Sequence, residues 1–284
     1  MNKRTSIRGG TYDGERALYH LIDTDVSDCI FAGPQDGESA LKECRGIRVQ
    51  DCSFSLRYPL WHAARFTVEN CFLDEKTRAP LWYCREGVLK NCTIDGIKTL
   101  RESADITVDN CAIHSPEFGW RCAGVEIRNC VIDSQYFLFE SKNVTINRLR
   151  MAGKYSLQYM ENVTAQNCYF DTKDAFWHAK NVTVKNSTLK GEYLGWYSEN
   201  LTLIDCRIIG TQPLCYCKNL TLTNCTTEGC DRAFEYSDIQ AVIRGHIDSV
   251  ENPKSGKITA DSIGEIIRGN EATNCNAEIV INKA

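Results

Sequence analysis

A repeat of 19 residues is the feature that most constrains how this chain can fold. From Cys92, seven steps of 19 residues run without an insertion and mostly reach a cysteine. These anchor positions are Cys92, Cys111, Cys130, Leu149, Cys168, Ser187, Cys206 and Cys225, and Cys52 and Cys71 extend the series upstream. A unit of this size cannot bury an apolar face alone, so the repeats must stack on one another.

The residues around each anchor predict short strands and turns. Aliphatic residues lie five and three places before the anchor, as Val182 and Val184 do before Ser187. A spacing of two with β-branched residues is typical of a strand. Glycines four places after several anchors predict tight turns. A leucine-rich repeat would need Leu at several fixed positions of each repeat, whereas here Leu dominates only one repeat position.

We therefore predict an all-β chain, a single-domain right-handed parallel β-helix with 19-residue coils. The right hand is the default for parallel crossover connections. Residues 1–28 are expected to form an N-terminal cap and residues 29–244 the repeating coils. Residues 245–284, where the register fades, are expected to form a last irregular coil and a C-terminal cap. Asn before most anchors predicts a ladder of side-chain amides, and the anchor cysteines a buried file of thiols.

Composition bounds the compartment and the partners. Sixteen cysteines would suggest disulfides in a short secreted chain, but Met1 to Gly10 is polar and no apolar run follows it. We expect a soluble cytoplasmic protein with reduced thiols and no membrane partner. The net charge is -4, and Lys and Arg form no basic stripe, so nucleic acid is not an expected partner.

Three further columns carry the residues that suggest a function. The Trp file, ten places before the anchor, holds all five tryptophans and reads Trp61, Trp82, Arg101, Trp120, Phe139, Gln158, Trp177, Trp196, Cys215 and Phe234. The Tyr–His file, one place later, reads His62, Tyr83, Glu102, Arg121, Glu140, Tyr159, His178, Tyr197, Tyr216 and Glu235. The flanking file, three places before the Trp file, reads Tyr58, Lys98, Glu117, Tyr136, Tyr155, Asp174, Tyr193, Gln212 and Asp231.

Two interpretations of these files stay open at this point. The tryptophans can face inward as core, because a pattern does not settle which way a residue faces where a strand bends. The polar files are less typical of a plain solvated surface, which is usually Lys, Glu, Ser and Thr. Aromatic side chains beside carboxylates suit a sugar, whose ring faces stack and whose hydroxyls form hydrogen bonds.

The chain also resembles a bacterial family of right-handed parallel β-helix proteins of unassigned function, within the pectin-lyase-like superfold. The segments that carry the resemblance are 37–43 (GESALKE), 57–62 (RYPLWH), 173–178 (KDAFWH), 191–198 (GEYLGWYS) and 210–216 (GTQPLCY). The resemblance implies the fold and a bacterial, cytoplasmic setting, and it implies no particular activity.

The wider superfold implies polysaccharide lyases, glycoside hydrolases and esterases as neighbours, which is an analogy of fold only. The sequence holds no clustered Asp set that resembles a calcium site and no adjacent Asp-Asp pair. These departures put lyase and polygalacturonase chemistry in doubt. Activity of a glycoside hydrolase or polysaccharide lyase type remains an open hypothesis.

The candidate catalytic residues are Asp174, His178, Glu140, Glu102 and Arg121. A carboxylate such as Asp174 can orient the imidazole of His178 for proton transfer. Arg121 between Glu102 and Glu140 favours an ion triplet over an acid and base pair. The candidate ligand-binding residues are Trp82, Tyr83, Trp120, Tyr136, Tyr155, Tyr159, Trp177, Trp196 and Tyr197.

We expect no cofactor and no metal. The cysteines Cys215, Cys217, Cys225 and Cys230 resemble a zinc site only superficially, because Cys225 belongs to the anchor column. Two functions remain: a protein that binds or processes carbohydrate, or a non-catalytic scaffold whose aromatic face forms a homo-oligomer or partner interface.

Overall fold

The computed structural model describes residues 4–33, 37–269 and 274–282. The chain divides into two compact units, Met1–Thr145 (unit 1) and Ile146–Ala284 (unit 2). The described residues form strands and turns but no helix, and so none that is long and apolar enough to span a membrane. The all-β prediction is confirmed, while the prediction of a single domain stays a prediction.

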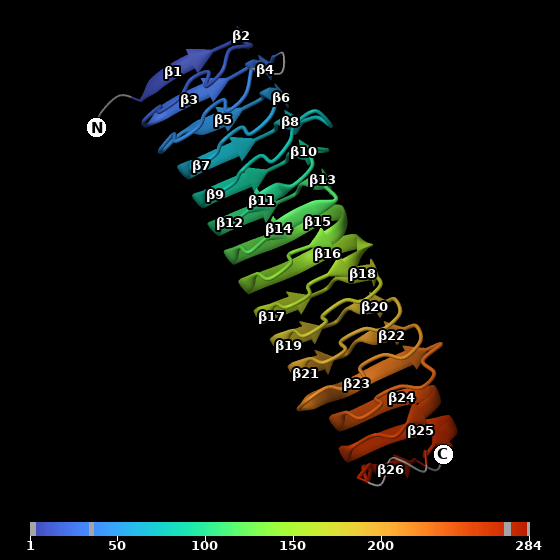
Figure 1. Cartoon of the computed structure of the whole chain (residues 1–284). Coiled ribbons are helices and arrows are strands. Elements are labelled where there is room, and N and C mark those ends of the chain that lie inside the picture. The colour runs from blue at the N-terminus through green and yellow to red at the C-terminus, as the bar shows by residue number, and fades with distance from the viewer. Residues whose placement is uncertain (1–3, 34–36, 270–273, 283–284) are drawn as a thin grey trace. The chain divides into compact units, whose positions relative to one another are not determined.

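Unit 1 is a stack of short parallel strands, drawn from blue to green in Figure 1. Its strands are β1 (Thr5–Arg8), β2 (Thr11–Tyr12), β3 (Thr24–Ser27), β4 (Ile30–Ala32), β5 (Arg48–Gln50), β6 (Ser53–Ser55), β7 (Ala64–Glu69), β8 (Phe72–Leu73), β9 (Arg85–Lys90), β10 (Thr93–Ile94), β11 (Thr99–Arg101), β12 (Ala104–Asp109), β13 (Ala112–His114), β14 (Glu117–Trp120) and β15 (Ala123–Phe137).

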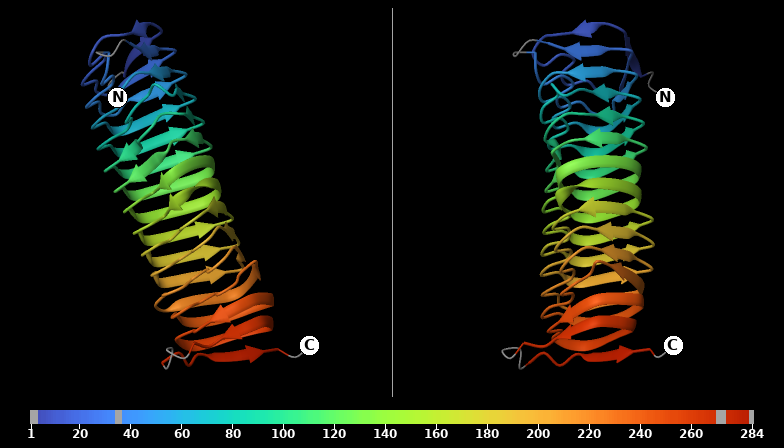
Figure 2. Two further views of the ribbon diagram at one scale, coloured as in Figure 1. Left: turned by 45° about the vertical axis from the view of Figure 1, so that its right-hand side comes forward. Right: turned by 90° about the vertical axis from the view of Figure 1, so that its right-hand side faces the viewer.

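Unit 2 repeats the arrangement, and the two views in Figure 2 show its strands lying one coil upon the next. Strand β16 (Lys142–Ser156) contains the boundary between the units. The others are β17 (Glu161–Gln166), β18 (Tyr169–Thr172), β19 (Lys180–Lys185), β20 (Thr188–Lys190), β21 (Glu199–Ile204), β22 (Arg207–Ile209), β23 (Leu220–Glu228), β24 (Asp238–Glu251), β25 (Ser255–Ile267) and β26 (Glu278–Ile281).

The strand register confirms the 19-residue coil. In unit 1, Ile106 of β12 lies beside Val125 of β15, 19 residues later. In unit 2, Val182 of β19 lies beside Leu201 of β21, again at an offset of 19. The pairing is parallel in both units, as a β-solenoid requires.

Strand pairing extends into the segments for which the sequence predicts caps. Strand β1 pairs with β3 at the same offset, Thr5 beside Thr24, so coiling begins upstream of residue 29. At the other end β24 pairs with β25, but Asp238 lies beside Ser255 and the ladder contains an irregularity. The coil shortens there, which is why the 19-residue pattern fades from the sequence.

The anchor cysteines form the buried file that the repeat predicts. Cys92, Cys111 and Cys130 in unit 1 are almost inaccessible to solvent. The amide of Cys92 donates to the sulfur of Cys111, and the amide of Cys111 to the sulfur of Cys130, both over 3.4 Å. All sixteen cysteines lie within the described residues and none is paired in a disulfide. The thiols thus serve as small acceptors between coils.

A second file of thiols and hydroxyls, absent from the sequence prediction, lies directly after the Tyr–His file. The amide of Cys84 donates to Ser103 and that of Cys122 to Ser141, each over 2.9 Å. Burial raises the pKa of Cys84 and of Cys122 to about 12. These thiols remain neutral at ordinary pH.

The asparagine ladder is confirmed, and it is double. In unit 1, Asn91 donates its side-chain amide to Asn70 and Asn110 to Asn91. A second ladder in unit 2 joins Asn200 to Asn181 and Asn219 to Asn200, each over 2.8 Å. The ladder residues have φ of 52 to 58°, a left-handed conformation that Asn tolerates better than most residues. Asn recurs here because it tolerates the left-handed backbone conformation and its side-chain amide forms the hydrogen bonds of the ladder.

Candidate functional site

The Trp file stacks ring upon ring along each unit. In unit 1 the indoles of Trp61 and Trp82 lie 5.2 Å apart and 5° from parallel, and in unit 2 those of Trp177 and Trp196 lie 5.6 Å apart at 4°. Each indole N–H donates to a backbone carbonyl, Trp82 to Lys98 over 2.7 Å and Trp177 to Tyr193 over 2.9 Å. The stacks and these hydrogen bonds fix the orientation of the rings.

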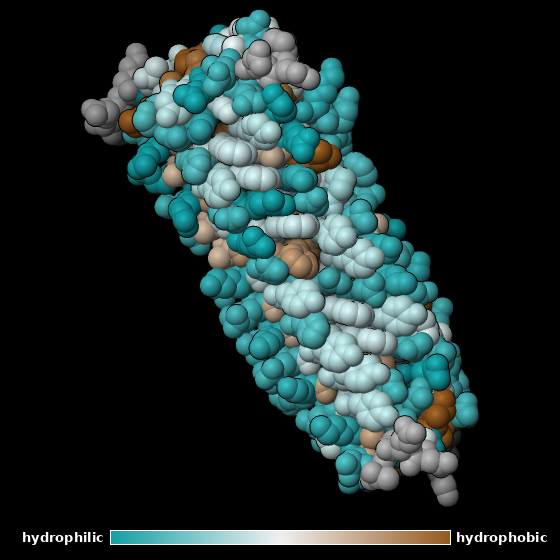
Figure 3. Space-filling view, in the orientation of Figure 1, coloured by the Kyte–Doolittle hydropathy of each residue, from teal (hydrophilic) through white to brown (hydrophobic). Residues whose placement is uncertain are grey.

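The tryptophans face neither fully inward nor fully outward. Every one of the five is half-buried. The core-facing interpretation and the exposed one therefore each hold in part, because every indole is partly buried and partly in solvent. Figure 3 shows pale side chains of intermediate hydropathy gathered along this face.

Arg101 takes the place of an aromatic ring in unit 1. Its guanidinium lies over the rings of Trp82 and Trp120, 4.5 and 4.7 Å from their centroids. It also pairs with the carboxylate of Glu117 over 2.9 Å, and Lys98 approaches Glu117 to 3.8 Å. The guanidinium is therefore held between two ring faces and is already neutralised.

The Tyr–His file forms a second stack beside the first. In unit 2 the ring of His178 lies between Tyr159 and Tyr197, at 5.1 and 5.0 Å, and Tyr197 stacks on Tyr216 at 4.9 Å. In unit 1 only His62 and Tyr83 stack, at 4.9 Å. The two files meet edge to face, as Trp177 and Tyr197 do at 75°.

The residues of this file share a left-handed backbone conformation. Tyr159, His178, Tyr197 and Tyr216 all have φ between 52 and 61°. Each amide bonds to the next coil, Tyr159 to the carbonyl of Trp177 over 2.8 Å and His178 to that of Trp196 over 3.0 Å. A left-handed residue is unusual for these side chains, and the hydrogen bonds compensate for its cost.

The remaining outward members of the file in unit 1 are charged. Arg121 donates to Glu140 over 2.8 Å, and this carboxylate raises the pKa of Arg121, with a smaller contribution from Glu102. Of the ion triplet expected for Glu102, Arg121 and Glu140, the described structure contains the pair of Arg121 with Glu140, and Glu102 is not ion-paired with Arg121. Their proposed catalytic role is not tested by this geometry.

Asp174 and His178 lie near each other in sequence but share neither a hydrogen bond nor an ion pair in the described structure. Asp174 is only 9% exposed, and burial raises the pKa of its carboxyl. The proton-transfer role that the sequence suggests for this pair stays a prediction, and the geometry lends it no support.

The other predicted binding residues lie around these stacks. Trp120 meets Phe139 at 5.2 Å and Tyr136 edge to face at 5.7 Å. The ammonium of Lys154 lies 5.0 Å from the ring centroid of Tyr155. Tyr236 was not predicted, although its ring continues the stack from Tyr216 at 5.8 Å. It was missed because the column placed Glu235 in that position, one residue earlier.

The faces and the edges of the stacked rings differ in how far they are exposed to solvent. Within each stack the faces are covered by neighbouring rings, so the edges are what solvent meets. Tyr159 and Tyr197 are 49% and 43% exposed. In the described part of the chain, neither the hydroxyl of Tyr197 nor the imidazole nitrogens of His178 have a hydrogen-bond partner. On the two successive coils of His178 and Tyr197, the file therefore presents edges that can form hydrogen bonds.

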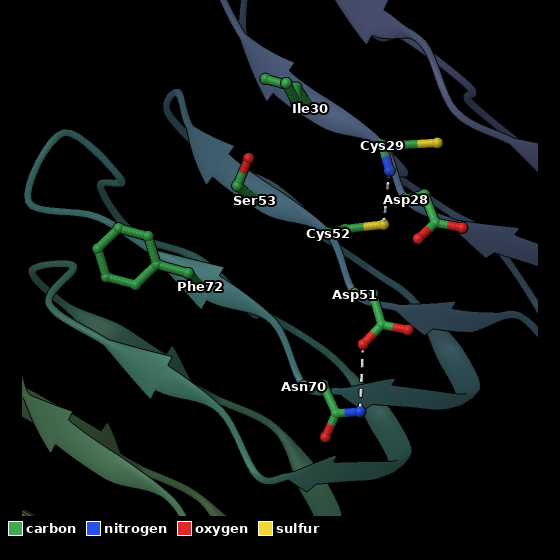
Figure 4. A pocket seen from close by; sticks show the side chains of 8 residues that line it. All are labelled: Asp28, Cys29, Ile30, Asp51, Cys52, Ser53, Asn70 and Phe72. Atoms are coloured by element: carbon green, nitrogen blue, oxygen red, sulfur yellow. Dashed lines mark hydrogen bonds between the residues drawn. The ribbon is translucent and has the colours of Figure 1, made fainter.

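Two shallow hollows lie elsewhere. One of about 450 Å³ lies at the anchor corner of unit 1, where Ile30, Ser53 and Phe72 border the carboxylate of Asp51 (Figure 4). There the side-chain amide of Asn70 donates to Asp51 over 3.2 Å, so the hollow lies beside the first steps of the asparagine ladder. A smaller one in unit 2 lies beside Asp205 and Arg207. Neither includes a residue of the three files.

No group of three or more His, Cys, Asp or Glu side chains among the described residues is arranged to hold a metal ion. Cys215, Cys217, Cys225 and Cys230 are all buried and each sulfur bonds to backbone carbonyls, as Cys225 does to Leu203.

Comparisons with known proteins place the fold. The surface adhesin PfbA of Streptococcus pneumoniae is similar with a TM-score of 0.50 and 8% identity, over 84% of each chain. A family 28 exopolygalacturonase of Yersinia enterocolitica has a TM-score of 0.41 and 9% identity, over 93% of this chain and 72% of its own. The A-module of the mannuronan C-5 epimerase AlgE4 of Azotobacter vinelandii has a TM-score of 0.37 and 10% identity, over 99% and 91%.

No curated protein matches the chain by sequence. The structural similarity confirms the fold, a right-handed parallel β-helix of the pectin-lyase-like kind. A family whose description is "Protein of unknown function (DUF3737)" matches residues 5–281, nearly the whole length. The chain belongs to the DUF3737 family.

Proposed function

We propose that the exposed face of unit 2 binds a polysaccharide along its Tyr–His file. The observation that carries this proposal is the stack of Tyr159, His178, Tyr197 and Tyr216, whose rings cover one another and whose edges face solvent. Phenol and imidazole edges both donate and accept hydrogen bonds, which is also what a sugar hydroxyl does.

The mode of binding differs from the stacking that the sequence suggests. A sugar ring laid flat on an aromatic face needs a free face, and inside the file the faces are occupied by other rings. The ligand is instead held through hydroxyl groups at the ring edges. Because stacking already fixes the side-chain rotamers, little entropy is lost when a ligand binds.

The spacing favours a polymer over a single sugar. Successive coils of a parallel sheet are about 4.8 Å apart, so equivalent groups recur at that interval along the file. Each hydrogen bond contributes only about 0.5 to 1.5 kcal/mol, and affinity requires several of them together. A repeating ligand lying along the file makes the same contact on successive coils.

The proposal concerns binding. Of the three carboxylates predicted to be catalytic, Glu140 is ion-paired with Arg121 and Asp174 is buried, while Glu102 is exposed and lies on another coil. The alternative function, an interface between copies of the chain or with a protein partner, would use the same edges. The two functions differ in whether the face contacts a polysaccharide or another protein chain, and binding and self-association experiments distinguish them.

Affinity electrophoresis against a panel of neutral and acidic polysaccharides tests the proposal. The parent protein should be retarded by at least one polymer. Tyr197→Phe removes the hydroxyl but keeps the ring, and it should weaken binding about 3- to 10-fold at unchanged stability. Tyr169→Phe is the matched control, because Tyr169 lies on β18, outside the three files, against the guanidinium of Arg150.

Retardation by no polymer would overturn the proposal. So would self-association in sedimentation experiments that Tyr197→Ala abolishes, since the face would then be an interface. Equal affinities for the parent and Tyr197→Phe would remove the ring edge from the binding account.

A further inference from the structure

Three carboxylates belong to the face of unit 2. Asp174 and Asp231 belong to the flanking file and Glu235 to the Tyr–His file. None of the three forms an ion pair with any described residue. Glu235 accepts a hydrogen bond from the hydroxyl of Tyr216 over 3.0 Å, and this contact leaves its charge in place.

The cations around this face are mostly committed to other carboxylates. Lys173 pairs with Glu192 over 3.0 Å. Arg232 pairs with Glu251 over 2.9 Å, and Lys180 approaches Glu199 to 4.0 Å. Lys154 is not committed in this way, because it forms no ion pair among the described residues and its charge favours the ionised form of the Asp174 carboxyl. At the other end of the face, around Asp231 and Glu235, the charge without an ion pair is negative.

The groups at the centre of the face are neutral donors and acceptors. The hydroxyl of Tyr197 and the side-chain amide of Gln212 can each donate and accept. Burial, together with the neighbouring carboxylate of Glu235, raises the pKa of Tyr216, so its phenol stays protonated. Recognition of a uronate carboxylate needs the opposite chemistry, a guanidinium or ammonium free to pair with it.

From this distribution of charge we infer that the face of unit 2 selects neutral polysaccharides and rejects polyuronates. The inference rests on the proposed function, because it names the class of ligand for the same site. A polyuronate carries a carboxylate on every sugar, and lying along the file it would bring like charges together on successive coils. Such juxtaposition is a known means of excluding a wrong partner.

Binding to four purified polymers tests the inference: a linear neutral glucan, a neutral mannan, polygalacturonate and polymannuronate. At about 0.15 M salt, where charges are screened beyond about 8 Å, at least one neutral polymer should bind about tenfold more tightly than either polyuronate. The ratio should shrink as salt rises.

A double variant sharpens the test. Asp231→Asn with Glu235→Gln removes two charges without changing side-chain size. The ratio of neutral to acidic affinity should then fall several-fold, whereas Glu126→Gln, which removes an exposed carboxylate on β15 of unit 1, should leave it unchanged.

The outcomes separate the inference from the proposed function. Preferential binding of a polyuronate would overturn the inference and leave polysaccharide binding standing, as would an unchanged ratio in the double variant. Binding of none of the four polymers, or of any in the wider panel, would overturn both.

Discussion

The same two files carry different chemistry in the two units. In unit 1 the Trp file is interrupted by Arg101, which lies between Trp82 and Trp120, and the outward file ends in Glu102, Arg121 and Glu140. In unit 2 the outward stack runs from Tyr159 to Tyr236 without a charged residue in it. The contrast shows that the fold fixes where the side chains of each file lie. The residue types then decide whether those side chains form ion pairs with one another or leave their polar groups free to bind a ligand.

The largest expected effect comes from removing an indole, and it should differ between the units. Trp177→Ala removes a ring parallel to Trp196 and a hydrogen bond of 2.9 Å, at a cost of about 3 kcal/mol. Trp120→Ala also removes a cation–π contact with Arg101, but its neighbour Phe139 is tilted and its hydrogen bond is 3.4 Å long, whereas Trp177 has further edge-to-face contacts with His178 and Tyr197. Trp120→Ala should therefore cost about 1 kcal/mol less. Urea unfolding measures both, with Trp177→Phe as the control. Equal losses would contradict the comparison.

High pH should destabilise unit 1 through its thiols. Burial raises the pKa of Cys84 and Cys122 to about 12, above the value near 8.5 of an unfolded chain. A raised pKa means that stability is complete below about pH 8.5 and is lost as pH rises towards 12. At pH 11 each thiol should remove about 2 to 3 kcal/mol.

Thermal unfolding between pH 8 and 11 measures this effect. Ser103 and Ser141 already occupy the same file, so replacing Cys84 and Cys122 by Ser should make the profile less steep. Part of the alkaline loss should remain, because burial also raises the pKa of Cys217 and Cys230 in unit 2 to about 12. A profile as steep as that of the parent would show that other groups cause the alkaline loss.

A smaller effect should follow from Arg101→Gln, which gives unit 1 the residue that unit 2 has at Gln158. The change removes two cation–π contacts and the ion pair to Glu117, at about 1 to 2 kcal/mol. Arg101→Lys keeps the charge but not the flat guanidinium, and should recover only part of the loss. Full recovery with Lys would mean that stacking contributes nothing.

The smallest expected effect is a gain in stability. Because burial raises the pKa of Asp174, ionising this carboxyl opposes folding. The stability that the protonated carboxyl gives the folded state is therefore lost as pH rises from about 4 through the folded pKa. Asp174→Asn should therefore raise the melting temperature at pH 7 and leave it unchanged at pH 3. A lower melting temperature for Asp174→Asn at pH 7 would indicate an unrecognised partner.

Much of the fold follows from the sequence, because a strict period places like residues on successive coils. The anchor thiols, the amide ladder and the strand register were all predicted from Cys111, Asn110 and Val182 and their neighbours. Coiling before residue 29 was not, since Thr5 and Thr24 carry no anchor residue. The second file at Cys84 and Ser103 was missed because its members vary between thiol, hydroxyl and methyl.

For the candidate site, the sequence predicted which residues recur at the same repeat position but not how their side chains lie. Periodicity placed Trp177, His178 and Asp174 on one coil, but could not show that His178 stacks between tyrosines while Asp174 is buried. Asp174 and His178 both have a left-handed backbone conformation, so the local backbone conformation does not distinguish them, and the difference lies in what packs around each side chain. Two residues that look like a catalytic pair in the sequence can therefore differ in burial and form no contact with each other.

The most direct test of the central claim is a crystal structure of the protein with the neutral oligosaccharide that binds best. The account predicts a sugar chain lying along the Tyr–His file of unit 2, with its hydroxyls bonded to Tyr197 and His178 and no sugar stacked on a ring face inside the file. A sugar bound elsewhere, or one that separates the rings of His178 and Tyr197 to stack between them, would contradict it.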